Sequence, residues 1–182
     1  MRLLALEEVA CLRGGRLLFE GLSLALGPGQ AALVRGPNGI GKSSLIRLAA
    51  GLLRPAAGTV ERAEAALADE HLALDERQAL GAALAFWVQD AARGLALMGL
   101  DHLTQMPVRM LSTGQRKRAV LARVVASGAP LWLLDEPANG LDGDGIERLE
   151  AAMAAHRAAG GAILAASHQP LGLADAQTVE LG

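Results

Sequence analysis

The stretch GPNGIGKSS, residues 36–44, constrains the fold more than any other part of the sequence. Gly36, four further residues, then Gly41, Lys42 and Ser43 match the pattern G-x-x-x-x-G-K-[ST]. The apolar run QAALVR precedes this match, and SSLIRLAAG follows it with apolar residues at helical spacing. A strand, a glycine loop and a helix in this order are typical of loops that bind a chain of phosphates.

The residue types indicate how such a loop would work. Glycines let backbone N–H groups turn inward as a nest for anions, and the following helix adds the positive end of its dipole. Lys42 is expected to bridge the β- and γ-phosphates, and Ser43 to place its hydroxyl on Mg²⁺. The alternative is a chance glycine-rich turn, which the strand–helix context disfavours. We therefore predict that nucleotide contacts the whole loop: Gly36, Pro37, Asn38, Gly39, Ile40, Gly41, Lys42, Ser43 and Ser44.

A second chemical feature is the pair of carboxylates in LWLLDEP, residues 131–137. Four apolar residues there predict a buried strand, which presents Asp135 and Glu136 at its carboxyl end, where open α/β sheets bind ligands. Asp135 suits Mg²⁺, through water, opposite Ser43. Glu136 can polarise a water in line with the γ-phosphate. The alternative is that both carboxylates only begin a turn before Pro137.

The remaining sequence alternates between strand-like and helix-like patterns. LLALEEV and RLLFEGLSLAL predict an N-terminal hairpin, while GGAILAAS and DAQTVEL predict late strands. Helices are expected from about residue 78 to 103, in GQRKRAVLARVVAS, and from about residue 145 to 158. This alternation predicts an α/β fold with a mostly parallel core sheet. We expect one domain over residues 1–182, with a helical subdomain at about residues 75–128.

The composition of the chain argues against several classes of function. The formal charge is −2 and only 2% of the residues are aromatic, so neither broad electrostatic binding of nucleic acid nor stacking on single strands is expected. Cys11 is the only cysteine, which excludes an internal disulfide and a cysteine-based zinc site and favours a small buried side chain. No run of about 18 apolar residues predicts a membrane-spanning helix, so any membrane role is expected to come through a partner.

Three further motifs resemble those of the ATP-binding-cassette (ABC) ATPases. LSTGQRKRAVLAR, residues 111–123, resembles the LSGGQ signature and its helix. NGLD, residues 139–142, follows Pro137 as the family's D-loop does, and His168 falls after the next strand, where the family has its switch histidine. The matches stand in the family's order and cover nearly the whole chain. The resemblance implies the ABC type of P-loop fold, with an N-terminal antiparallel β subdomain, and an ATPase that uses ATP and Mg²⁺.

The resemblance also implies how each nucleotide site is completed. In the family two cassettes pack head to tail, and each ATP lies between the glycine loop of one and the signature of the other. A second copy of this chain is therefore an expected partner. An ordinary helix cap is the alternative for Ser112. The residues expected to reach the second copy's nucleotide are Ser112, Gly114, Gln115 and Asp142.

The family's catalytic arrangement implies that His168 contacts the γ-phosphate and helps to hold Glu136 and the attacking water. Together with Lys42 these residues form the expected catalytic set, whereas His102 and His156 are expected on the surface.

The sequence departs from the family pattern at three places. Thr113 stands where the signature usually has glycine, and its branched side chain restricts the backbone. The aromatic that usually stacks on adenine is missing; Arg13 could stack its guanidinium instead, or be a solvated turn residue. The Q-loop glutamine has no clear match, because His71 stands nearest its place and Gln78 comes later.

Three segments of the sequence resemble one subgroup of the family. RGGRLLFEGLSL, PLWLLDEPANGLD and SHQPL are similar to the CcmA-type ATPases of the haem exporter used in cytochrome c maturation. This resemblance implies a peripheral subunit on the cytoplasmic face of a bacterial inner membrane, with integral membrane partners of the CcmB and CcmC type. The alternatives are a subunit of another ABC transporter or a soluble, non-transport ABC ATPase. A P-loop kinase would explain the glycine loop but not LSTGQ together with LDEP.

Overall fold

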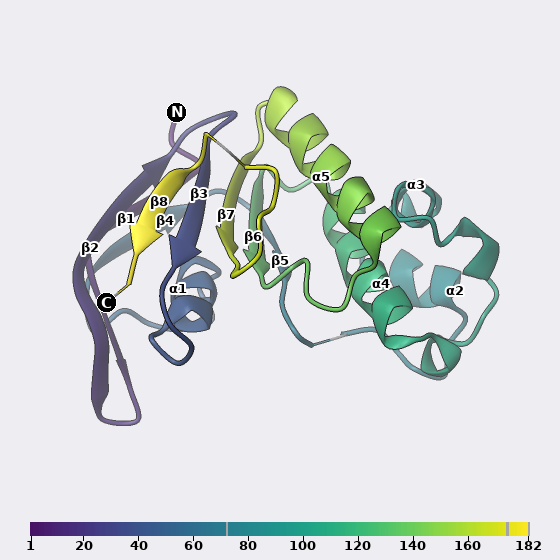
Figure 1. Cartoon of the computed structure of the whole chain (residues 1–182), viewed down its shortest axis with the longest axis horizontal. Helices are drawn as coiled ribbons and strands as arrows, with labels where there is room; N and C mark the ends of the chain where they lie inside the picture. The colour runs from purple at the N-terminus through teal and green to yellow at the C-terminus, as the bar shows by residue number, and fades with distance from the viewer. Residues whose placement is uncertain (72, 174, 182) are drawn as a thin grey trace.

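The protein is built on two β-sheets (Figure 1). The computed structural model describes residues 1–71, 73–173 and 175–181. A three-stranded antiparallel sheet has the order β2-β1-β4, and a five-stranded parallel sheet has the order β5-β6-β7-β3-β8. The strands are β1 Leu4–Arg13, β2 Arg16–Leu26, β3 Ala31–Arg35, β4 Ala57–Arg62, β5 Ala65–Ala68, β6 Leu131–Asp135, β7 Ala162–Ala166 and β8 Gln177–Glu180. This arrangement confirms the predicted fold class.

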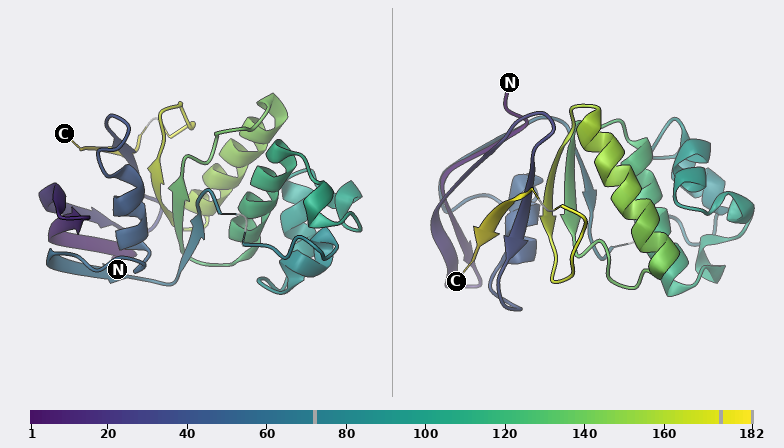
Figure 2. Two further views of the ribbon diagram at one scale, coloured as in Figure 1. Left: turned by 90° about the horizontal axis from the view of Figure 1, so that it is seen from below. Right: turned by 45° about the horizontal axis from the view of Figure 1, so that its top comes forward.

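Helices cover both faces of the parallel sheet. Figures 1 and 2 show α1 between the two sheets, whereas α4 and α5 lie on the opposite side of the parallel sheet. The α-helices are α1 Lys42–Ala49, α2 Leu80–Ala85, α3 Ala91–Leu97, α4 Thr113–Ala126 and α5 Gly143–Ala158; single 3₁₀ turns are η1 Asp101–Leu103 and η2 Val108–Met110. The α2 and α3 helices pack beside α4, away from the N-terminal hairpin (Figure 1).

The alternation of side chains along β6 explains why this strand is apolar throughout. Leu131 and Leu133 belong to the core cluster that includes α1 and the antiparallel sheet. Trp132 and Leu134 belong to the other cluster, which includes α4 and α5. Because both faces of the strand are covered, all five of its residues are buried and the sequence reads as one apolar run.

The N-terminal hairpin forms as predicted, with Gly14 and Gly15 between β1 and β2. Both glycines have positive φ values, 58° and 79°, as a two-residue hairpin turn of type I′ requires. The other edge of β1 pairs with β4, so the hairpin is extended into the three-stranded sheet.

The middle of the chain differs from the expected single helical stretch. The segment from Gln78 to Leu103 is divided into α2, α3 and η1, because Asp90 caps a new helix: its Oδ1 accepts from the Arg93 N–H at 3.0 Å. The sequence pattern also missed β5, whose four residues include three alanines, which have low strand propensity. Pairing with β6 places this strand in the sheet.

One histidine lies in a different place from the one predicted. His102 is exposed, as expected. The prediction that His156 is a surface residue was wrong: its ring is half-buried and stacks on Trp132 with ring centroids 3.9 Å apart and planes 10° apart. Gly161, which lacks a Cβ, makes room for the His156 ring. Burial lowers the pKa of His156, so this ring is neutral at neutral pH.

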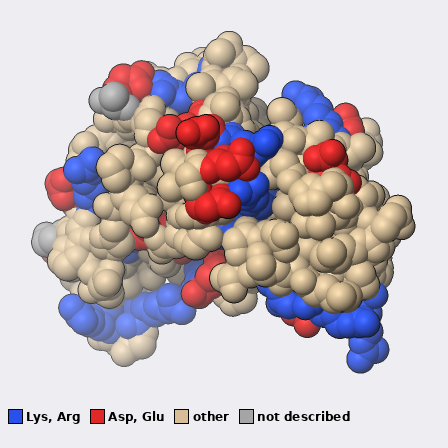
Figure 3. All heavy atoms as spheres, turned by 45° about the vertical axis from the view of Figure 1, so that its right-hand side comes forward, with Lys and Arg blue, Asp and Glu red and all other residues tan. Residues whose placement is uncertain are grey.

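Charges of both signs are distributed over the molecule. Figure 3 shows acidic and basic side chains next to one another near the middle of one face, while large parts of that face carry neither. None of the helices that the structure describes is both long and apolar enough to span a membrane.

Candidate functional site

The glycine loop connects β3 to α1 at the carboxyl edge of the parallel sheet. Gly36 has a φ of 141°, and a Cβ there would lie 2.5 Å from the carbonyl oxygen of Leu181. Gly41 immediately precedes α1 with a φ of 122°, and its Cβ would lie 3.2 Å from Leu18. Both positions therefore require glycine, for conformation and for space. The two glycines of the motif fix the path of the loop.

Lys42 is held inside this loop. Its residue is only 7% exposed, and its Nζ donates to the carbonyl oxygens of Gly36 at 2.8 Å and Pro37 at 3.1 Å. The same Nζ lies 2.9 Å from Nε2 of His168. A buried ammonium beside the backbone N–H groups of a helix N-terminus gives this point a strong positive potential. The loop is thus suited to bind an anion.

The acidic pair ends β6 at the same edge. Asp135 is 8% exposed, and its Oδ1 has no hydrogen-bond partner within the described part of the chain. Leaving a buried carboxylate oxygen unpaired costs free energy, so the atom is suited to a cation or an ordered water. Within the described residues no three His, Cys, Asp or Glu side chains gather as a metal cluster. Asp135 and the Ser43 hydroxyl fit Mg²⁺, whose other ligands are usually phosphates and waters.

Glu136 and His168 lie side by side. Glu136 has a φ of 46°, a left-handed conformation that is unusual for a residue with a Cβ, and its N–H donates to Ala166 at 2.8 Å. Its Oε1 lies 3.3 Å from Nε2 of His168, and its Oε2 accepts from the backbone N–H of His168 at 3.3 Å. Lys42, His168 and Glu136, which come from three distant parts of the sequence, therefore form one connected group; their catalytic roles stay a prediction.

Arg13 also lies at the glycine loop. It extends from β1, and its Nη1 donates to the Ser44 hydroxyl at 3.4 Å. A shallow pocket of about 290 Å³ is lined by Arg13, Leu18, Gly39, Gly41, Lys42, Ser43 and Ser44. The guanidinium is therefore placed where a nucleotide bound by the loop would extend; its contact with adenine stays a prediction.

The predicted signature residues lie elsewhere in the same chain. Ser112 caps α4: its hydroxyl accepts from the Gln115 N–H at 3.2 Å, and Gln115 Oε1 accepts from the Ser112 N–H at 2.9 Å. Asp142 caps α5 by accepting from the Gly145 N–H at 2.9 Å, and it also pairs with Arg118. These two bonds lower the pKa of Asp142. Since α1 and α4 lie on opposite sides of the sheet, one chain does not join its signature to its own glycine loop (Figure 2).

The side chains of the two candidates for the missing Q-loop glutamine make hydrogen bonds only with nearby residues among those the structure describes. His71 Nδ1 lies 3.1 Å from Asp69 Oδ2, and Gln78 donates to Asp75 Oδ2 at 3.2 Å. Sequence reasoning missed Lys117 on α4, whose Nζ lies 3.5 Å from the carbonyl oxygen of Asp135. Burial lowers the pKa of Lys117, and the nearby carboxylates of Asp135 and Asp69 partly oppose this shift. The only signal in the sequence was a lysine in a basic helix, which is usually a solvated residue.

A nest-forming loop with a buried lysine, next to an acidic strand end, defines a P-loop nucleotide-binding protein. Residues 19–139 match the family model described as ABC transporter. The cytochrome c biogenesis ATP-binding export protein CcmA of Sphingopyxis alaskensis is 57% identical over 99% of this chain and 97% of its own length. The protein of the same name from Novosphingobium aromaticivorans is 58% identical over 98% of this chain and 95% of its own. This chain belongs to the ABC transporter family, within the group of ATP-binding export proteins that these relatives represent.

Solved structures agree with the fold. One described as the structure of the ATP binding subunit of an ABC transporter aligns with a TM-score of 0.86 at 22% identity, over 98% of this chain and 85% of that chain. A nucleotide-free ATP-binding cassette from an ABC transporter aligns with a TM-score of 0.76 at 21% identity, over 93% of this chain and 82% of its own. The family assignment makes the chain an ABC ATPase that binds ATP.

Replacing Lys42 tests the phosphate loop. In Lys42→Met the apolar stem remains but the ammonium is lost, so we expect ATP binding to weaken by at least about tenfold, the worth of one charge-assisted hydrogen bond. Lys42→Ala should show the same loss. Binding is measured by titration with a fluorescent ATP analogue, and circular dichroism checks that both variants fold. Unchanged affinity in a folded Lys42→Met protein would contradict the role of the lysine.

Proposed function

We propose that this chain hydrolyses ATP at the interface between two copies of itself and thereby drives a conformational change in membrane-embedded partners. The observation that carries the proposal is the convergence of Lys42, His168 and Glu136 at one edge of the sheet. Lys42 binds the β- and γ-phosphates, and Glu136 takes a proton from the attacking water. His168 holds the Glu136 carboxylate and contacts the γ-phosphate.

Magnesium completes the cofactors of the proposed reaction. Ser43 and Asp135 are the residues that would hold it, because the first offers a hydroxyl and the second a buried carboxylate oxygen without a partner among the described residues. When bound, the ion would neutralise charge on the phosphate oxygens. Arg13, whose guanidinium donates to the Ser44 hydroxyl, would contact the sugar or base of the nucleotide.

The signature residues would act on the nucleotide of the second copy. Ser112, Gly114 and Gln115 stand at the N-terminus of α4, where the positive end of the helix dipole favours an anion. The Ser112 residue is exposed, so its hydroxyl can contact a phosphate presented by another copy while it caps its own helix. Asp142 stands at the corresponding end of α5 and would line the same interface.

The relatives named above favour haem export for cytochrome c biogenesis as the process that this ATPase serves. We infer that the chain is a peripheral subunit on the cytoplasmic face of a bacterial inner membrane. Its partners would be integral membrane subunits of the CcmB and CcmC type. The helical subdomain, about residues 75–128, includes α2, α3 and α4 and stands apart from the N-terminal hairpin (Figure 1).

Glu136→Gln separates binding from hydrolysis. The amide has nearly the shape of the carboxylate but does not accept a proton from water, so we expect ATP binding to persist while turnover falls by about 10²-fold or more. With Mg²⁺ and ATP the variant should accumulate as a dimer in light scattering. Glu147→Gln, an exposed change on α5, is the matched control and should leave both quantities unchanged. Parental turnover in Glu136→Gln would refute its assignment as the base.

Ser112→Asp distinguishes the helix cap from a contact with phosphate. Aspartate caps helices about as well as serine, so the free energy of unfolding should change by less than about 0.5 kcal/mol. A carboxylate facing the γ-phosphate of the second copy repels it, so ATP turnover should fall at least about tenfold, which is about 1.4 kcal/mol in the barrier. Ser112→Ala, which loses the cap, should instead cost about 1 kcal/mol of stability. A Ser112→Asp protein with parental turnover would limit this residue to capping.

Purification from membranes tests the proposed process. A tagged copy replaces the chromosomal gene in its own bacterium and is extracted in mild detergent. We expect integral membrane subunits to co-purify, and Glu136→Gln to abolish c-type cytochromes in a haem-staining gel while leaving b-type haems. Glu147→Gln serves as the control. Normal c-type cytochromes in the Glu136→Gln strain would exclude haem export, while co-purification of membrane subunits alone would still support another ABC transporter.

A further inference from the structure

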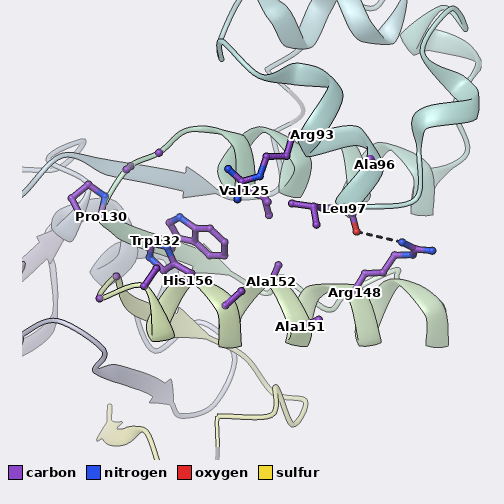
Figure 4. A pocket seen from close by; sticks show the side chains of 16 residues that line it. Arg93, Ala96, Leu97, Val125, Pro130, Trp132, Arg148, Ala151, Ala152 and His156 are labelled. Atoms are coloured by element: carbon purple, nitrogen blue, oxygen red, sulfur yellow. Dashed lines mark hydrogen bonds between the residues drawn. The ribbon is translucent and has the colours of Figure 1, made fainter.

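A second cavity lies at the edge of the sheet away from the glycine loop. Its volume is about 660 Å³, within the range of small-molecule sites. The segments that precede β6 and β7 form one wall, so the cavity is at the amino ends of strands whose carboxyl ends hold Asp135 and His168. The other walls come from α3, the end of α4 and α5 (Figure 4).

Small and apolar residues make most of the cavity surface. One face of α5 contributes Ala151, Ala152 and Ala155, and Ala159 follows directly after the helix. Their methyl groups leave room between α5 and α3, and the stacked rings of Trp132 and His156 close one end. An apolar body can therefore lie along α5 and displace water from these surfaces.

The free polar groups of the cavity are hydrogen-bond donors. The Trp132 residue is only 4% exposed, and its indole N–H makes no hydrogen bond within residues 1–71, 73–173 and 175–181. Figure 4 shows Arg93 extending from α3 toward the Trp132 end of the cavity, and the Arg93 guanidinium likewise has no partner within those ranges. At the opposite end Arg148 pairs with Asp144 and donates to the Leu97 carbonyl oxygen at 3.5 Å.

The other residues that line the cavity carry no negative charge. Neither Asp nor Glu is among the described residues that line the cavity. The His156 ring is already used, because its Nε2 lies 3.3 Å from the Ala162 carbonyl oxygen. A ligand that satisfies this surface must supply both an apolar body and an anionic acceptor for Arg93 and the Trp132 N–H.

We propose that this cavity binds a small amphiphilic anion: an apolar chain or ring that lies against the alanines of α5, with a carboxylate or phosphate between Arg93 and the Trp132 indole. This binding site is separate from the nucleotide site, and its existence does not depend on the proposed ATPase cycle.

Trp132 itself can report on binding. The chain has two tryptophans, so Trp87→Phe in the full-length protein leaves Trp132 as the only emitter; Trp87 is half exposed and does not line the cavity. We titrate this protein with dodecanoate and dodecyl phosphate below their critical micelle concentrations, with dodecanol below its solubility limit, and with inorganic phosphate. We expect a saturable change in Trp132 emission with dodecanoate or dodecyl phosphate, and the two arms identify which head group is bound. Dodecanol and inorganic phosphate should bind at least tenfold more weakly.

Substitutions at the cavity and a control outside it locate the site. Arg93→Ala should weaken binding of the anionic amphiphile at least tenfold, whereas Arg109→Ala, an exposed arginine outside the cavity, should change it less than twofold. Ala155→Phe fills the cavity from an exposed helix position and should abolish the emission change, with circular dichroism as the check on folding; Ala151→Phe is the second such variant. Equal binding of dodecanol, equal losses in the two arginine variants, or no emission change with either anion would overturn the proposal.

Discussion

The site depends on three neighbouring strands, β6, β7 and β3, which have the same length and are paired along nearly their whole extent. β7 lies between β6 and β3, and its last residue, Ala166, is paired with Asp135 on one side and Val34 on the other. All three strands are five residues long. The chain therefore leaves the sheet within one residue of the same level three times, and the glycine loop, Glu136 and, after Ser167, His168 follow the three strand ends. A shift of one residue in any strand would turn its side chains to the other face and separate these groups.

The features that could be predicted from the sequence are those determined locally. Uninterrupted apolar runs identified β3, β6 and β7, because a strand covered on both faces has no polar positions. The glycine loop was predictable because Gly36 and Gly41 adopt backbone conformations that other residues rarely allow. The connected set of Lys42, His168 and Glu136 followed once the family's order of motifs was recognised, since strand ends of a parallel sheet meet at one edge.

The features that sequence reasoning missed depend on tertiary contacts. β5 is a strand because β6 offers it an edge, not because alanine favours a strand. His156 is half-buried because its ring stacks on Trp132, which is far from it in the sequence. Lys117 lies near Asp135 because α4, which carries it, packs on one face of the parallel sheet. In each case the partner is distant along the chain, so local periodicity carries no information about it.

The helix α5 runs from the carboxyl ends of the parallel strands to their amino ends, so one rigid element contacts both. Its cap, Asp142, lies beside the signature helix, and its sixteen residues, Gly143–Ala158, span about 24 Å at 1.5 Å per residue. A ladder of ion pairs runs along this helix: Arg118 pairs with Asp142 and Asp144, and Asp144 also pairs with Arg148, which lines the second cavity. Because Arg148 is already paired with Asp144, the cationic side chain of the cavity that has no ion-pair partner within the described residues is Arg93. The ladder therefore fixes Arg148 as part of the scaffold that joins α4 to α5, and it leaves the recognition of an anion to the other end of the cavity.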